Sequence, residues 1–112
     1  MKIDLTEVTT MQGIRLAISD DSGAEQGHAY LYIMYNDLHQ RPFGLMEDVF
    51  MEESARGKGY GTQLLERLIQ EAKNQHCYKL IGTSRDSRPK VHQLYQRLGF
   101  TSHGREFRMD FS

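Results

Sequence analysis

Short runs of apolar residues, separated by turn signals, fill the first half of the chain. Residues 14–19 and 43–51 combine apolar and β-branched side chains, and residues 27–35 form an aromatic and branched run. Such runs are typical of β-strands. Residues 3–8 carry a weaker version of the same pattern, and the Asp-Asp-Ser-Gly sequence of residues 20–23 predicts a tight turn. This half of the chain therefore predicts an antiparallel meander.

The second half of the chain has the periodicity of helices. Apolar residues recur at intervals of three and four between positions 64 and 72, which predicts an amphipathic helix over residues 59–74. The apolar residues 78–83 predict a strand parallel to its predecessor, because a helix separates the two. Pro89 fits the first turn of a second helix, with Ser87 as its cap and Gly99 at its end.

Alternating apolar residues near the end of the chain predict a closing strand through Phe107, Met109 and Phe111. Together these elements predict an α/β fold, with a central mixed sheet and helices on its faces. At 112 residues the chain is expected to form one domain, residues 1–112. The aromatic run at residues 27–35 favours a strand packed on both faces or a contact between two copies, so a homodimer is one expected state.

The charge balance limits the classes of partner. The chain has 14 Lys and Arg against 15 Asp and Glu, a formal net charge of −1. Non-specific nucleic-acid binding depends on a strong positive field, so no nucleic acid is expected. The apolar runs are too short to span a membrane, and Cys77 is the only cysteine, which suits a cytoplasmic protein. The five histidines form no metal-binding pattern, so no metal is expected and the histidines are expected to lie at the surface.

A glycine-rich turn, residues 56–61 with the sequence RGKGYG, joins the strand at 43–51 to the following helix. Backbone N–H groups at such a helix start form an anion site. A Walker A loop needs Ser or Thr directly after Gly-Lys, where Gly59 stands. A dinucleotide fingerprint needs the spacing G-x-G-x-x-G and an acidic residue after the next strand, where Thr83 and Ser84 stand. Both of these phosphate-binding motifs are therefore excluded.

Two segments resemble signatures of the GNAT superfamily of N-acetyltransferases. Arg56, Gly59 and Gly61 match its acyl-CoA loop, Gln/Arg-x-x-Gly-x-Gly/Ala, and residues 94–100 match its helix end, Leu-Tyr-x-x-Leu-Gly-Phe. The resemblance covers residues 27–111 and implies a GNAT-like fold. Only residues 8–13 separate the first two expected strands, so the N-terminal helical region is expected to be reduced. A compact acceptor site, or one completed by a second subunit, would follow.

The resemblance implies acetyl-CoA as co-substrate. The pantetheine arm would pair like an extra strand with Val49, Phe50 and Met51, and Thr62 would cap the pyrophosphate. The backbone amides that would hold this pyrophosphate belong to Arg56, Gly57, Lys58, Gly59, Tyr60 and Gly61. The alternatives are that Arg56 and Lys58 are solvated loop cations and that Thr62 is an ordinary first-turn residue.

Tyr95 occupies the tyrosine position of the second signature, so the resemblance implies that it donates a proton to the CoA thiolate. A phenol is protonated at neutral pH and can donate. The alternative is a core tyrosine on the same apolar stripe as Val91 and Leu98.

Glu47 and Asp48 precede the expected pantetheine edge, and alternation sends them to opposite faces. Glycosylamine-phosphate acetyltransferases of the superfamily carry a similar Glu-Asp, which favours Glu47 as the base. Glu47 could instead pair with an arginine at the surface, and Asp48 could be the base, a substrate contact or a partner that orders the loop. Ser84 and Arg85 follow the strand at 78–83 and are further candidates for substrate contact.

These expectations combine into an N-acetyltransferase that moves an acetyl group from acetyl-CoA to a primary amine of a small molecule or peptide by direct attack. One alternative is a non-catalytic CoA-binding or regulatory module on the same fold, which would bind CoA without turnover. Another is a nucleic-acid or protein adaptor, which would not bind CoA.

Overall fold

The computed structural model describes residues 1–7, 11–36 and 38–112 of the chain. These residues form two compact units, residues 1–82 and residues 83–112. The first unit contains a four-stranded sheet and a long helix, and the second contains a short helix followed by an extended segment.

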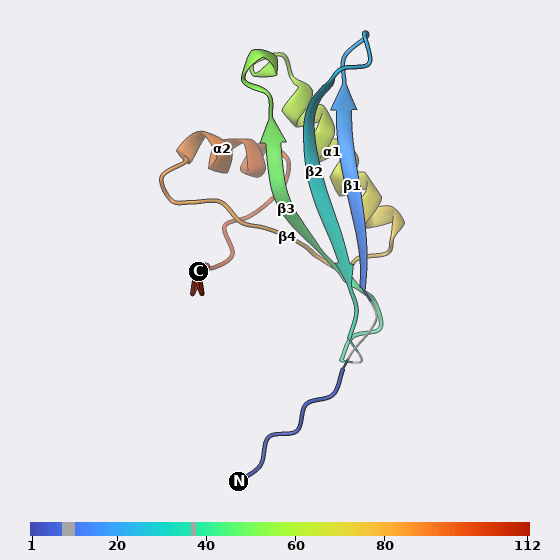
Figure 1. Ribbon diagram of the computed structural model, residues 1–112, viewed down its shortest axis with the longest axis vertical. Helices are drawn as coiled ribbons and strands as arrows, with labels where there is room; N and C mark the ends of the chain where they lie inside the picture. The colour runs from blue at the N-terminus through green and yellow to red at the C-terminus, as the bar shows by residue number, and fades with distance from the viewer. Residues whose placement is uncertain (8–10, 37) are drawn as a thin grey trace. The chain divides into compact units, whose positions relative to one another are not determined.

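The sheet of the first unit has the strand order β1-β2-β3-β4 (Figure 1). Strands β1 (Met11–Ser19), β2 (Glu25–Met34) and β3 (Phe43–Met51) are antiparallel neighbours, and β4 (Leu80–Gly82) pairs with β3 in parallel. The predicted meander and the predicted parallel strand are both confirmed. The last strand is shorter than the predicted 78–83, and β1 begins three residues before the predicted 14–19.

The turn between β1 and β2 is organised by Asp20. Its Oδ1 accepts hydrogen bonds from the backbone N–H groups of Ser22 and Ala24 at 2.9 and 3.0 Å, and its Oδ2 accepts one from Gln26 Nε2 at 3.0 Å. Gly23 adopts φ 87° and its N–H donates to the Asp20 carbonyl at 3.0 Å. The tight turn predicted at residues 20–23 is confirmed. The turn forms here because the Asp side chain provides the hydrogen-bond acceptors that the backbone of a reversing chain lacks.

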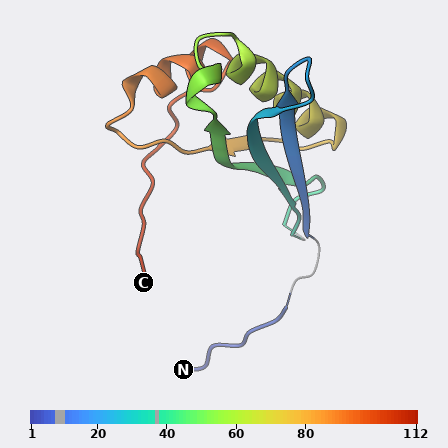
Figure 2. The ribbon, with the colours of Figure 1, turned by 45° about the horizontal axis from the view of Figure 1, so that its top comes forward.

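Helix α1 (Tyr60–Asn74) lies across one face of the sheet, behind β1 and β2 in Figure 1 and above them in Figure 2. A short 3₁₀ helix, η1 (Glu53–Ala55), precedes it. The apolar stripe of α1 packs against the side chains of β2 and β3 that point toward it. The buried core of this unit comprises Ala29, Leu31, Ile33, Met46, Ala55, Leu64, Leu65, Leu68 and Ala72.

Burial alternates along β2, so the sheet has two different faces. Gly27, Ala29, Leu31 and Ile33 are buried under α1, whereas the residues between them are half-buried. The predicted aromatic strand therefore has one core face and one partly accessible face. We call the accessible side, away from α1, the open face of the sheet.

The weak strand predicted at residues 3–8 is not formed by residues 3–7, and Val8 lies outside the described residues. Ile3 and Leu5 are 86% and 91% exposed, so this short run has no partner strand that would bury its alternate side chains. Within residues 1–7 there is no helix.

The second unit contains helix α2 (Pro89–Arg97), with Pro89 at its start as predicted. Arg88, not the predicted Ser87, is the N-cap residue, and no side chain caps the helix. Gly99 follows the helix with φ 107°, a conformation that glycine adopts without a Cβ clash.

The closing strand predicted at residues 107–111 is absent, since no residue from 100 to 112 has regular secondary structure. Phe107, Met109 and Phe111 are 91%, 76% and 93% exposed. The alternation of apolar residues is typical of a strand, but a strand also needs a neighbouring strand edge with which to pair.

Candidate active site

Strand β3 contains a β-bulge at the position where the sequence analysis placed the pantetheine edge. Glu47 pairs with Tyr30 and Phe50 pairs with His28, so Asp48 and Val49 together lie opposite Ala29. Asp48 adopts φ 50°, in the left-handed region. Because of the extra residue, Glu47 and Phe50 point to the same face although they are three positions apart. The regular alternation expected for Glu47 and Asp48 therefore ends at Asp48.

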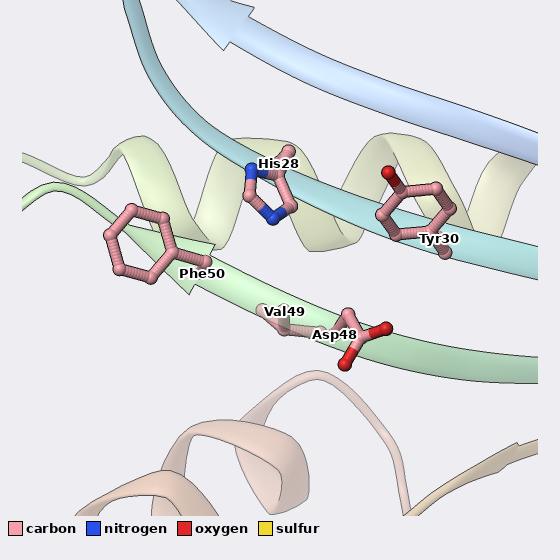
Figure 3. A pocket seen from close by; sticks show the side chains of 5 residues that line it. All are labelled: His28, Tyr30, Asp48, Val49 and Phe50. Carbon is pink, nitrogen blue, oxygen red and sulfur yellow. The ribbon is translucent and has the colours of Figure 1, made fainter.

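The bulge forms part of a pocket on the open face of the sheet. The pocket has a volume of about 580 Å³ and is lined by His28, Tyr30, Asp48, Val49 and Phe50. Figure 3 shows the rings of His28, Tyr30 and Phe50 on the near side of β2 and β3, with α1 behind the strands. Asp48 lies on β3, across the pocket from Tyr30 on β2 (Figure 3). The pocket thus combines three rings, one carboxylate and the irregular backbone of β3.

The glycine-rich turn lies at the carboxyl end of the same strand. Gly57 and Gly59 adopt φ 82° and 81°, a conformation that other residues rarely take, and a Cβ at either position would meet no atom within 4 Å. Glycine is therefore favoured at these two positions by the left-handed backbone conformation, and not by close contact with neighbouring atoms. The turn stays open to a ligand above the start of α1.

The amino end of α1 has the features of an anion site. Gly59 is its N-cap residue, no side chain caps it, and the first turn contains no acidic residue. The first N–H groups of a helix lack intrahelical acceptors and carry a partial positive charge. Arg56 and Lys58 lie in the preceding turn and are exposed, so both can contribute further positive charge.

The end of β3 and the start of α1 lie close together. A Cβ on Gly61 would lie 3.7 Å from Met51 Cγ, and Tyr60 and Thr62 on either side are half-buried. Met51 in turn packs on β2, where a Cβ at Gly27 would overlap Met51 Sδ. The structure therefore brings the predicted pantetheine edge and the predicted pyrophosphate loop together.

An ion-pair network borders the pocket. The Arg15 guanidinium donates two hydrogen bonds to the Glu25 carboxylate, at 2.9 and 2.8 Å, and lies 5.9 Å from the centre of the Tyr30 ring. The hydrogen bonds from Arg15 hold the pKa of Glu25 below its usual range, and the same bonds raise the pKa of Arg15. His28 Nδ1 is 3.7 Å from Glu25 Oε2. Glu25 is therefore a fixed negative charge next to His28.

Three of the predicted site residues lie in the second unit. Tyr95 is on α2, half-buried, with its ring centre 5.4 Å from that of Phe100. Ser84 precedes α2, and its Oγ is buried without a hydrogen-bond partner among the described residues. Arg85 is exposed, and its carbonyl oxygen lies 2.8 Å from His92 Nε2. This last bond ties the loop before α2 to the helix itself.

Two pocket residues were not among the predicted site residues. His28 and Tyr30 were expected to be a surface histidine and a core or interface tyrosine, but both line the pocket. Alternation along residues 27–35 does place them on one face. The sequence does not indicate the pairing register between β2 and β3. This register places His28 and Tyr30 next to the bulge.

Other reactive groups contribute no further site. Cys77 is half-buried, and removal from water raises the pKa of its thiol, which makes the nucleophilic thiolate scarcer. Across residues 1–7, 11–36 and 38–112, no three His, Cys, Asp or Glu side chains converge as metal ligands would.

Comparison with known proteins decides the family. Residues 14–100 match the model of the acetyltransferase (GNAT) family. This match spans β1 to the end of α2 and includes both signature segments. The chain belongs to the GNAT family.

Among proteins similar to this GNAT chain is glucosamine 6-phosphate N-acetyltransferase of Trypanosoma brucei brucei, 39% identical over 62% of this chain and 46% of the relative. Another is the L-methionine sulfoximine/L-methionine sulfone acetyltransferase of Pseudomonas paraeruginosa, 32% identical over 83% of this chain and 54% of the relative. The chain thus spans about half the length of these relatives.

Solved structures agree with the family assignment. A crystal structure of an acetyltransferase from Trypanosoma brucei superimposes with a TM-score of 0.77 at 30% identity, over 88% of this GNAT chain and 69% of the other. The predicted mixed α/β GNAT-like fold is confirmed. None of the described helices is both long and apolar enough to cross a membrane.

Proposed function

We propose that this chain is an acyl-CoA-dependent N-acetyltransferase that uses acetyl-CoA and acts on a primary amine of a small molecule or peptide. The observation that supports this most strongly is the proximity of Met51 to Gly61, where an added Cβ would lie 3.7 Å from Met51 Cγ. It joins an irregular strand end to an uncapped helix start within one unit. An elongated ligand with an anionic diphosphate and an amide-rich arm fits such a junction.

The proposed donor site has two parts. The diphosphate of acetyl-CoA would accept hydrogen bonds from the backbone of residues 56–61, with Thr62 in the first turn of α1, as anions commonly do at helix starts. The pantetheine amides would pair with Val49, Phe50 and Met51. The bulge then leaves the acetyl group beside the pocket, because Asp48 and Val49 depart there from the regular ladder.

The reaction needs little more than positioning and proton transfer. An ammonium acceptor first loses a proton, and the neutral nitrogen then attacks the thioester carbonyl carbon. A C–N bond forms, the C–S bond breaks, and the departing thiolate takes a proton. Holding both reactants in one orientation supplies on the order of 7–11 kcal/mol. The pocket on the open face is the proposed place of the acceptor amine.

The predicted roles of individual groups remain part of this proposal. Tyr95 would protonate the thiolate, and Glu47 and Asp48 are the predicted candidates for the base. Ser84 and Arg85 would contact the acceptor. The family match covers residues 14–100 and thus reaches into both units, which supports the prediction of one catalytic domain.

Acetyl transfer is tested by incubating the chain with acetyl-CoA and a panel of amines and measuring released thiol. Glucosamine 6-phosphate and L-methionine sulfoximine belong in the panel because they are named for the relatives. We expect thiol release that depends on the amine, and the acetylated product by mass spectrometry. CoA binding without amine-dependent thiol release would instead identify a non-catalytic CoA-binding module.

The loop itself is tested by Gly59→Ala. A Cβ in the left-handed conformation costs about 1–2 kcal/mol, so we expect the CoA dissociation constant to rise by about tenfold in calorimetry. Gly104→Ala is the matched control, because a Cβ there meets nothing within 4 Å and Gly104 has no positive φ. Equal CoA affinity in both variants would argue against the loop as the binding site.

A further inference from the structure

His28 lies in the pocket on the open face, where the acceptor amine is proposed to bind. It lines the pocket together with Asp48 and Val49 of the bulge. Its side chain is 26% exposed, which gives a proton a route to solvent. Imidazole is the side chain that ordinarily exchanges a proton between pH 5 and 8.

The imidazole is held in place from two sides. Its ring centre lies 5.4 Å from that of Phe50 and 5.9 Å from that of Tyr30, the second contact being edge-on at 75°. Phe50 is directly opposite His28 in the β2–β3 ladder, so the backbone fixes this pairing. Ring rotation out of the pocket would lose both contacts.

The Nδ1 side of the His28 ring faces Glu25. His28 Nδ1 lies 3.7 Å from Glu25 Oε2, and Glu25 is itself clamped by two hydrogen bonds from Arg15. Figure 3 shows the second nitrogen, Nε2, turned toward β3 at Val49. A histidine whose one nitrogen meets a carboxylate and whose other nitrogen meets the substrate has the arrangement of a general base.

We infer that His28 is the general base of the acetyl transfer, oriented by Glu25, which Arg15 holds in turn. This inference rests on the proposed function. Nε2 takes one proton from the acceptor ammonium, and the resulting imidazolium is stabilised by the Glu25 carboxylate. The neutral amine attacks the thioester, and His28 later releases its proton to solvent. Over the whole reaction one ammonium and one thioester give one amide, one thiol and one released proton.

The carboxylate predicted as base, Glu47, is less well placed. It lies opposite Tyr30 on the same face as His28, but it is not among the residues that line the pocket. Asp48 does line the pocket, and its charge there suits attraction of the ammonium. We therefore assign Asp48 to binding of the acceptor and His28 to removal of its proton.

The charges around His28 set the direction of the expected pH effects. Arg15 comes from β1, Glu25 and Tyr30 from β2, and Glu47 and Asp48 from β3. Three of these groups are carboxylates, and the Arg15 guanidinium is paired with the Glu25 carboxylate. Glu25→Gln removes a negative charge and leaves Arg15 unpaired. Both changes disfavour the imidazolium, so the acid limb of the rate profile must move to lower pH.

The test is the pH profile of kcat/KM between about pH 5 and 9.5 at saturating acetyl-CoA, using whichever of glucosamine 6-phosphate and L-methionine sulfoximine is acetylated faster. For His28→Gln we expect a loss of roughly 10²-fold or more near pH 7, with the acid limb of the wild type abolished. CoA affinity should stay within about twofold of the wild type. His103→Gln, an exposed histidine in a segment without regular structure, is the control and should keep the wild-type profile.

The outcomes separate the inference from the proposed function. If the His28→Gln enzyme is active and its acid limb is unchanged, His28 is not the base. If the acid limb is lost only in Glu47→Gln, Glu47 is the base instead. A wild-type chain that binds CoA but acetylates no amine overturns the proposed function and with it this inference. Should His28→Gln fail to fold, the pH profile of Glu25→Gln provides the test. An acid limb that does not move to lower pH in this variant contradicts the assignment of His28.

Discussion

Asp48 is the residue whose backbone shapes the pocket. Its φ of 50° lies in a region that Asp tolerates better than most residues, since its short polar side chain can bond locally. The left-handed turn adds one residue to β3 and brings Phe50 opposite His28. One unusual dihedral angle therefore decides which side chains meet in the pocket.

Tyr95 is the residue whose hydroxyl is predicted to protonate the thiolate. Tyr95→Phe keeps the ring that packs 5.4 Å from Phe100 and removes only the oxygen. We expect kcat to fall by about 10²-fold, since a general acid contributes about 10²–10⁴-fold, while CoA affinity is retained. Steady-state kinetics checks this, with Tyr35→Phe, an exposed tyrosine, as the control. Unchanged kcat would leave Tyr95 as a packing residue only.

At the scale of single elements, the first hairpin and the start of α1 are both fixed by local chemistry. The Asp20 side chain replaces missing backbone acceptors in the β1–β2 turn, and glycines supply the conformations of the loop before α1. The hydrogen bond that the Ser22 hydroxyl donates to Asp20 Oδ1, followed by that from the Ala24 backbone, lowers the pKa of the Asp20 carboxyl. A lowered pKa means that the folded state favours the charged carboxylate over the acid.

The hairpin is therefore expected to lose stability in acid. Stability from Asp20 is present above its unfolded pKa of about 3.9 and is lost as pH falls through the lower folded value. We expect Asp20→Asn to melt at a lower temperature than the wild type at pH 7, and this gap should close as the pH approaches 2. Asp21→Asn, in the same turn, is the matched control. Thermal melts followed by circular dichroism at several pH values measure this gap. A difference in melting temperature that stays constant with pH would contradict the prediction.

At the scale of the whole molecule, one core in the first unit carries the candidate donor site. Leu31, Leu65 and Leu68 are its largest fully buried side chains, and they join β2 to α1. The start of α1 and the end of β3 are positioned by this packing. The described structure thus links the stability of the sheet–helix pair to the geometry of the proposed CoA site.

Leu68→Ala removes most of a fully buried side chain from the middle of this core. We expect the free energy of unfolding to fall by about 2–5 kcal/mol, because lost burial and the remaining cavity both contribute. Urea denaturation measures this change. Glu66→Ala, exposed on the same helix, should change stability by only about 0.5 kcal/mol or less. Similar losses in the two variants would mean that α1 does not pack through its leucine stripe.

The sequence by itself determined the elements whose signals are local. The leucine spacing of α1, the Asp and Gly of the first turn and the glycines of residues 56–61 act over a few positions, so helix, hairpin and loop were all predicted. The same local signals predicted strands that residues 3–7 and 107–111 do not form, because alternation shows only that a segment suits a sheet. Whether an edge is available for it depends on the rest of the chain.

Only the tertiary structure decided how the pocket is composed. A bulge changes the register of β3 against β2, and register is a relation between two strands that neither sequence states alone. It set His28 opposite Phe50, so a histidine expected at the surface became a pocket residue. Local chemistry fixed where the chain turns, and long-range pairing fixed which side chains share a site.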